Sequence, residues 1–267
     1  WAYPIHSETR SGVHPGITYD SILICRRVEE SRLPSRPLPK AIFEAEVRNR
    51  VDADADRFVE EHPKLSIEDL YVAVMGRALQ VLSENYAVML RSGKALSIKD
   101  VRKTLEDLGD IAFDVLLKKF FAKTPDVDRV SKIYASIFAG KRYISLDTID
   151  KVTKHGGITF EVFEEELLIG EKKKSVRKVL DPSERRNLIL KKLDRGYTLL
   201  YIDAAQMLRL AWTEGKFKQA VGQYAKNGVE KNKLESYVKF LAQRTGDKEW
   251  ARIAKALEEA SIPTLEK

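Results

Sequence analysis

The chain has 267 residues, of which 43% are hydrophobic and 33% are charged, and its formal net charge is +7 at pH 7. This composition predicts a folded, soluble protein with two or three packed sub-domains. No apolar run approaches the roughly 18 residues of a membrane span, and the start has no secretion signal, so we expect a cytoplasmic protein with no membrane partner. One Cys and four scattered His exclude an intrachain disulfide and argue against a bound metal.

The chain opens with two predicted strands, which occupy residues 1–31 together with their loop. The first strand spans residues 1–5, and the second runs from Tyr19 to Arg27 with a near-continuous apolar centre. Such a centre is typical of a strand that is buried on both faces of a sheet. Because two strands alone are only marginally stable and the sequence starts without Met, we expect this pair to belong to a larger sheet in a longer protein.

A mainly helical region follows a proline-rich linker at residues 32–39. Start signals at Pro39, Ser66 and Ser97 each precede an amphipathic pattern, and Thr124 with Pro125 predicts the start of a fourth helix that ends near Gly140. We therefore expect a helical domain, in its simplest form a bundle, over residues 40–143.

The next predicted domain, residues 144–195, has a winged-helix-like order. A short amphipathic helix begins at Ser145 and a second one at Thr159. Residues 166–180 then contain two apolar runs around a polar, glycine-containing turn, the pattern of a β-hairpin. A capping pattern that begins at Asp181 predicts a further helix, which seats the hairpin.

Positive charge is concentrated in this domain. Residues 171–195 contain ten Lys and Arg against four Asp and Glu, a net of +6 in a chain whose total is +7.

After this domain, the pattern of residues 196–267 predicts a C-terminal helical domain. Tyr197, Tyr201 and Trp212 occur there at helical spacing, so we expect them to be core residues and not platforms for stacking bases.

The chain begins Trp1-Ala-Tyr-Pro-Ile-His-Ser-Glu-Thr-Arg10, and its second strand reads Asp20-Ser-Ile-Leu-Ile-Cys-Arg-Arg27. These two segments resemble the final strand pair of the methyltransferase domain in large adenine-specific DNA methylases, the multi-domain kind that often carries a zinc-ribbon insert. The predicted hairpin with Leu180-Asp-Pro-Ser-Glu-Arg185, and residues 200–215, resemble the family's C-terminal region more loosely. The resemblance implies methyl transfer from S-adenosylmethionine to adenine N6 in the full-length protein, with the base flipped out of double-stranded DNA.

The chain itself lacks the motifs that this chemistry requires. It has neither a glycine-rich turn after a first strand for S-adenosylmethionine nor an Asp-Pro-Pro-Tyr-like motif for the adenine amine. We therefore expect no catalytic residue and no cofactor in this chain. The resemblance implies a C-terminal accessory region, joined to the remainder of the methylase chain, that holds duplex DNA or recognises a target.

The predicted DNA contacts come from the hairpin and the helix after it, since Lys and Arg there would meet phosphates. They are Lys172, Lys173, Lys174, Arg177, Lys178, Arg185 and Arg186. The alternative is a solvated surface, because most charge runs have no partner. A second candidate set, at the rim of the methylase active site, is Ser7, Glu8, Thr9 and Arg10; here the alternative is a simple turn of the chain.

A different class of function also fits the sequence. The helical region could be a protein-interaction scaffold that docks partner subunits of a restriction or phage-defence system. DNA binding that weakens steeply with salt separates the two hypotheses, because only phosphate contacts release counterions.

Overall fold

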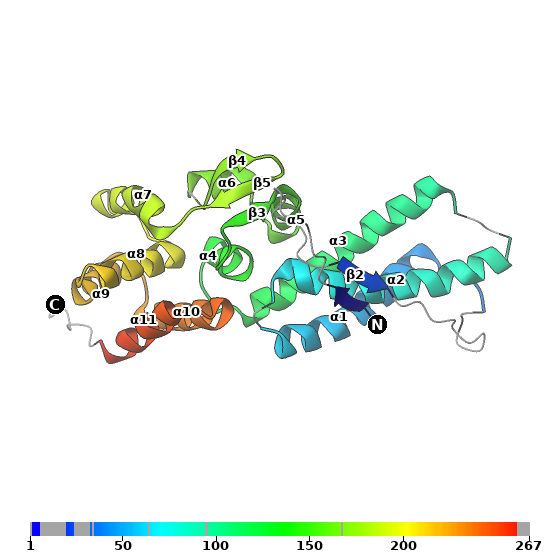
Figure 1. The fold of residues 1–267 in the computed structure, drawn as a ribbon, viewed down its shortest axis with the longest axis horizontal. Helices are drawn as coiled ribbons and strands as arrows, with labels where there is room; N and C mark the ends of the chain where they lie inside the picture. The colour runs from blue at the N-terminus through cyan, green and yellow to red at the C-terminus, as the bar shows by residue number, and fades with distance from the viewer. Residues whose placement is uncertain are drawn as a thin grey trace. The chain divides into compact units, whose positions relative to one another are not determined.

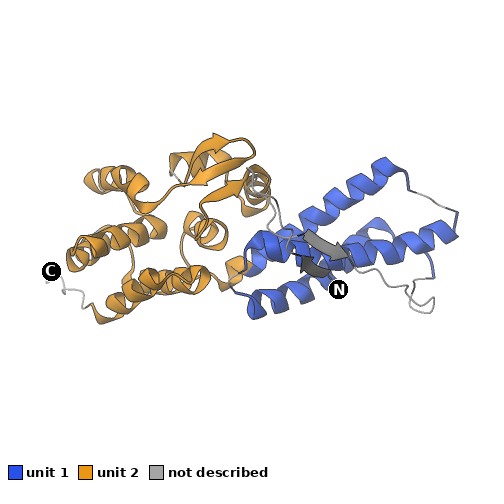
Figure 2. Ribbon diagram, viewed as in Figure 1, with its two compact units in different colours: residues 1–119 blue, residues 120–267 orange. Residues whose placement is uncertain are grey.

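The computed structural model describes residues 2–5, 20–23, 33, 35–63, 65–93, 96–166 and 168–260, with the backbone alone before residue 33. The described residues are mainly helical with a small three-stranded antiparallel sheet, which confirms the predicted mainly α class (Figure 1). The chain divides into two compact units, residues 1–119 and residues 120–267 (Figure 2).

The first unit contains the strand pair that the sequence predicts. Strands β1 (Ala2–Ile5) and β2 (Asp20–Leu23) pair antiparallel, with Ala2 opposite Leu23. The predicted rim residues Ser7, Glu8, Thr9 and Arg10 lie outside the described residues.

Three long helices complete the first unit: α1 (Lys40–Glu61), α2 (Ile67–Arg91) and α3 (Ile98–Lys123). The predicted caps explain two of their starts, because Ser66 and Ser97 accept hydrogen bonds from the backbone N–H groups of Asp69 and Asp100. The seam between α1 and α2 is fully buried and consists of small or β-branched side chains. Each fully buried Val there contributes about 1.5–3 kcal/mol relative to exposure; the seam comprises Val47, Val51, Ala55, Val74 and Ala78.

The second unit begins differently from the prediction. The predicted helix start at Thr124 is wrong: the helix begins at Arg129 as α4 (Arg129–Ile133) and continues as a π-helix, η2 (Tyr134–Phe138). Asp128 is the cap, because its side chain accepts the N–H of Ser131 at 2.8 Å. Thr124 is instead buried, and its hydroxyl donates to the carbonyl of Phe120 at the end of α3.

A small mixed module follows in the order strand, helix, helix, hairpin. Its elements are β3 (Tyr143–Ser145), α5 (Leu146–Gly156), α6 (Phe160–Glu165), β4 (Ile169–Lys173) and β5 (Val176–Val179). All pairs are antiparallel and the strand order is β3-β5-β4, so the second arm of the hairpin is the central strand. The third strand, β3, was not predicted, because three residues are too short to show a period of two.

Five helices complete the second unit: α7 (Pro182–Asp194), α8 (Tyr201–Thr213), α9 (Phe217–Lys226), α10 (Lys231–Thr245) and α11 (Lys248–Glu259). Helix α8 is central, since it packs against α4, α7, α9, α10 and α11. The predicted domain boundaries at residues 143/144 and 195/196 both fall inside this unit because those helices share one core around α8.

Candidate nucleic-acid interface

The hairpin ends in a two-residue turn that presents lysines to solvent. Lys172 lies opposite Arg177 and Lys173 opposite Val176, so the turn consists of Lys174 and Ser175. Lys174 has φ 57°, the left-handed region that a non-glycine residue occupies at a cost of about 1–3 kcal/mol.

The glycine that the sequence predicts in the hairpin turn lies in a strand instead. Gly170 lies in β4, where the register shifts between Ile169 and Lys172 and two residues of β4 face one of β5. A Cβ on Gly170 would lie 2.8 Å from Leu180 Cδ2. A larger residue at Gly170 would therefore displace the Leu180 side chain, and this glycine belongs to the bulge and not to the turn.

Lys172, Lys173 and Lys174 carry the free charge of the hairpin. All three are exposed, and none of them forms an ion pair within the part of the chain that the structure describes. Lys172 and Lys173 end strand β4 and point to opposite faces of the hairpin, and Lys174 lies in the turn, so the three can meet an anion of extended shape such as a nucleic-acid backbone from more than one side. These three predicted residues are therefore brought together at an accessible tip.

Arg177 and Lys178 have different surroundings. Arg177 shares its sheet face with Ile144, its partner on β3, so its side chain turns toward α6. There it pairs with Glu164 and lies 5.3 Å from the ring centroid of Phe160. Lys178 pairs with Glu184 at the start of α7, and this hydrogen bond raises the pKa of Lys178. Both charges are already neutralised by an acid of the same unit.

The prediction that Arg185 contacts DNA is wrong. Its side chain has no exposed surface, whereas Arg186 next to it is partly exposed and pairs with Glu214 at 2.7 Å. Arg185 Nη2 donates to Asp203 at 2.6 Å and Nη1 donates to Gln206 at 2.5 Å, both on α8. A guanidinium enclosed in this way cannot reach a phosphate.

Arg185 instead supports the base of the hairpin. Its Nε and Nη2 donate to the carbonyl of Glu166, three residues before β4, at 3.0 and 2.8 Å. Lys192 adds a second link, because it pairs with the carboxylate of Glu166 and with Asp203. The signal that sequence analysis missed is Asp203, an acidic residue inside the otherwise apolar start of α8, where only a buried cation could balance it.

Helix α6, which precedes the hairpin, is acidic. Among its six residues are Glu161, Glu164 and Glu165, and it contains no Lys or Arg. Its exposed side would repel a phosphate backbone, so α6 is a poor candidate for a DNA contact and the hairpin tip is a better one.

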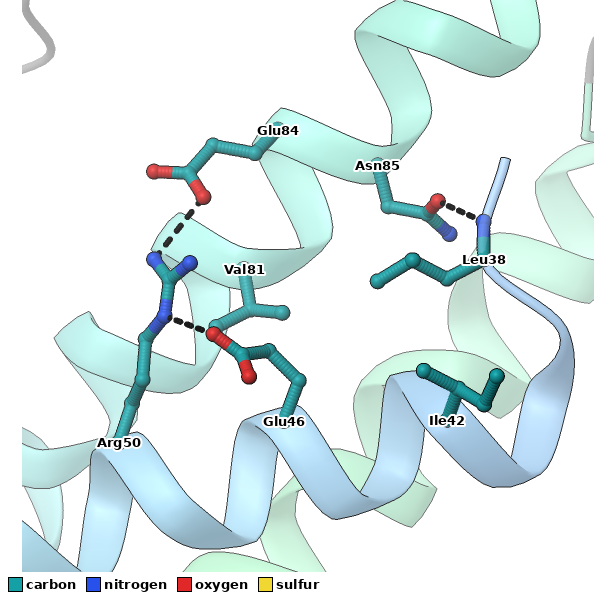
Figure 3. Close-up of a pocket in the computed structure, with 7 residues that line it drawn as sticks. All are labelled: Leu38, Ile42, Glu46, Arg50, Val81, Glu84 and Asn85. Atoms are coloured by element: carbon teal, nitrogen blue, oxygen red, sulfur yellow. Dashed lines mark hydrogen bonds and ion pairs between the residues drawn. The ribbon is translucent and has the colours of Figure 1, made fainter. Parts of the chain in front are cut away.

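A recess lies between α1 and α2 (Figure 3). It measures about 190 Å³, and Arg50 crosses it to donate to Glu46 at 2.6 Å and to Glu84 at 2.9 Å. Burial lowers the pKa of Arg50, but the hydrogen bonds and charges of the two carboxylates outweigh this and raise it. At the rim, the N–H of Leu38 donates to Asn85 Oδ1 at 2.8 Å. These polar groups are already paired with one another, and the hydrogen bond from Arg50 to Glu84 holds α1 and α2 together.

Two aromatic side chains differ from the expectation of core residues. Tyr197 is 55% exposed and Trp212 is 36% exposed, the latter in edge contact with Phe217.

Among the described residues, no group of three or more His, Cys, Asp and Glu could hold a metal ion. No described helix is both long enough and apolar enough to cross a membrane. Comparisons with known proteins find no matching family model, curated protein or solved structure.

Proposed function

We propose that residues 129–179 are a winged-helix-like module that holds duplex DNA by its phosphates. Helix α4, strand β3, helices α5 and α6 and the β4–β5 hairpin follow the order of a winged helix, with the hairpin as the wing. The observation that carries the proposal is the hairpin tip, where Lys172, Lys173 and Lys174 are exposed and form no ion pair with any described residue. With the resemblance described above, the chain would be the accessory region of an S-adenosylmethionine-dependent adenine-N6 DNA methyltransferase, and catalysis would belong to the rest of that protein.

The contact is proposed to be with the backbone and not with base edges. A helix that reads the major groove needs side chains that donate to base edges and tolerate phosphates, whereas α6 is six residues long and acidic. Binding should therefore depend little on sequence and strongly on salt. Three phosphate contacts give a log–log slope of about −2.7, at −0.9 per contact.

The test compares two triple variants of equal charge change by fluorescence anisotropy on a duplex at several salt concentrations. K172A/K173A/K174A removes the charge of the tip, and K248A/R252A/K255A removes three exposed cations of α11 that form no ion pair within the described part of the chain. Arg177 is kept, because its contacts with Glu164 and Phe160 are structural. We expect the tip variant to lose most of the slope and the α11 variant to keep it.

Equal losses in both variants would mean that net charge alone attracts DNA, and no loss in either would mean a solvated tip. The second outcome favours the scaffold hypothesis, in which the chain docks partner subunits. Exposed Tyr197 and Trp212 are the observation on its side, since aromatic residues are enriched at protein interfaces.

A further inference from the structure

Ser175 differs from the other serines of the described structure. The hydroxyls of the capping and helical serines are hydrogen-bonded, for example Ser66 to Asp69 and Ser183 to Asp181. Among the described serines, only Ser35 and Ser175 have a hydroxyl without a partner, and both are exposed. A free, exposed hydroxyl is the chemical requirement for transfer of a group to a side chain by another enzyme.

The surroundings of these two serines separate them. Five of the six residues within three positions of Ser175 are Lys or Arg, whereas Ser35 has two, Arg32 and Arg36, with prolines beside it. A protein kinase with an acidic substrate cleft selects the first pattern by charge complementarity. Ser175 also lies in the turn, next to the three lysines proposed to hold DNA.

We propose that Ser175 is a phosphorylation site and that its phosphate switches off the lysine tip. This inference rests on the proposed DNA-binding function of the same hairpin. In the reaction, Ser175 Oγ forms a bond to the γ-phosphorus of ATP while the bond from that phosphorus to the β–γ bridging oxygen breaks. ADP leaves with the electron pair, and the hydroxyl proton passes to the catalytic base of the kinase.

The charge balance explains the switch. Arg177 and Lys178 are paired with Glu164 and Glu184, so the free charge of the tip comes from Lys172, Lys173 and Lys174. A phosphate adds about −1.5 to −2 at pH 7 and three acceptor oxygens in the turn that directly follows these lysines. Glu171 on the same strand is also exposed and forms no ion pair with a described residue, so the net charge of the tip is about +2 and the modification brings it close to zero.

The turn can present Ser175 at limited cost. A kinase cleft that takes its acceptor in an extended form has to open the turn and break the hydrogen bond from the N–H of Leu146 to the carbonyl of Ser175. The left-handed Lys174 lowers the cost of opening, because its strain is released when the turn opens.

The experiment uses the full chain, ATP and a serine kinase that prefers basic flanking residues, with mass spectrometry to locate phosphate. A peptide of residues 169–180 shows that the kinase accepts the sequence, S175A removes the acceptor, and Ser35 is the internal control. We expect one phosphate per chain, on Ser175. The DNA slope should fall from about −2.7 to about −0.9, which corresponds to roughly 30-fold weaker binding at about 0.15 M salt, and S175E should show part of the effect.

Three results would overturn the inference: phosphate on the peptide but not on the chain, phosphate on Ser35 in place of Ser175, or phosphate on Ser175 with unchanged DNA binding. Failure of the proposed function is distinguishable, because the unmodified chain would then show no salt-dependent binding that requires the three lysines, whatever the mass spectrum shows.

Discussion

Arg185 and Asp203 are both fully buried, and at the scale of single residues each of these two side chains balances the charge of the other. Burying an ion pair has a desolvation cost that cancels much of its attraction, but removing Arg185 leaves Lys192 as the one described cation that pairs with the buried Asp203 and deprives Gln206 and the Glu166 carbonyl of their donor. We expect R185A to lower the free energy of unfolding by about 3–5 kcal/mol. Urea denaturation followed by circular dichroism measures this.

Arg186 is the matched control, since it is the adjacent arginine and its ion pair with Glu214 is partly exposed. R186A should cost no more than about 1 kcal/mol. The double variant R185M/D203L removes both charges and should recover much of the stability that R185A loses. If R185A and R186A were equally mild, the buried pair would not be what holds α7 on α8.

At the scale of elements, the N-terminus of α7 connects the hairpin to the rest of the second unit. Asp181 accepts the N–H groups of Ser183 at 2.8 Å and Glu184 at 3.0 Å, and Glu184 in return accepts the N–H of Asp181 at 3.1 Å. The hydrogen bond from the Ser183 hydroxyl is the main cause that lowers the pKa of Asp181 below its ordinary value of 3.8. D181A should therefore cost about 1 kcal/mol at neutral pH.

The pH dependence of this cost has a defined sign. Because the folded pKa lies below the unfolded one, the stabilisation by the Asp181 carboxylate is present above pH 3.8 and is lost as pH falls through the lower folded value. The difference in unfolding free energy between wild type and D181A should shrink below about pH 4. D194A, at the opposite end of the same helix, is the control and should show neither the cost nor the pH dependence; a pH-independent cost of D181A would point to packing and not to the carboxylate.

The elements that sequence could predict are those with a local cause. Ser66, Ser97 and Asp181 each satisfy backbone N–H groups within three residues, so the helix starts that they predict are confirmed. Thr124 is also of a type that often caps helices, but its hydroxyl donates to the carbonyl of Phe120 in the preceding helix. Asp128 caps the next helix instead. Local pattern does not show which of two adjacent caps is used.

The candidate site was less predictable, because it depends on contacts between distant residues. Lys172, Lys173 and Lys174 are free because the turn projects them, whereas Arg177 and Arg185 have the same charge but are paired with Glu164 and Asp203. A net charge counted along the sequence does not separate these cases. Three of the seven predicted contacts, Arg177, Lys178 and Arg185, are thus part of the support of the hairpin.

At the scale of the whole molecule, the charge is divided unequally between the two units. Residues 1–119 contain 18 Lys and Arg against 19 Asp and Glu, a net of −1, whereas residues 120–267 contain 29 against 21, a net of +8. A long-range field that attracts polyanions should therefore come from the second unit alone.

The second unit should fold and bind DNA as a separate fragment. Residues 120–260 hold their own core, including Phe120, over whose ring Arg244 lies at 4.6 Å, and α8 at the centre. We expect this fragment to unfold cooperatively in urea and to bind duplex DNA with the salt slope of the full chain, since it keeps the three tip lysines. The complementary fragment, residues 1–119, should not bind. A folded 120–260 fragment with a markedly smaller slope would show that the first unit supplies phosphate contacts, and binding by 1–119 would place the interface there.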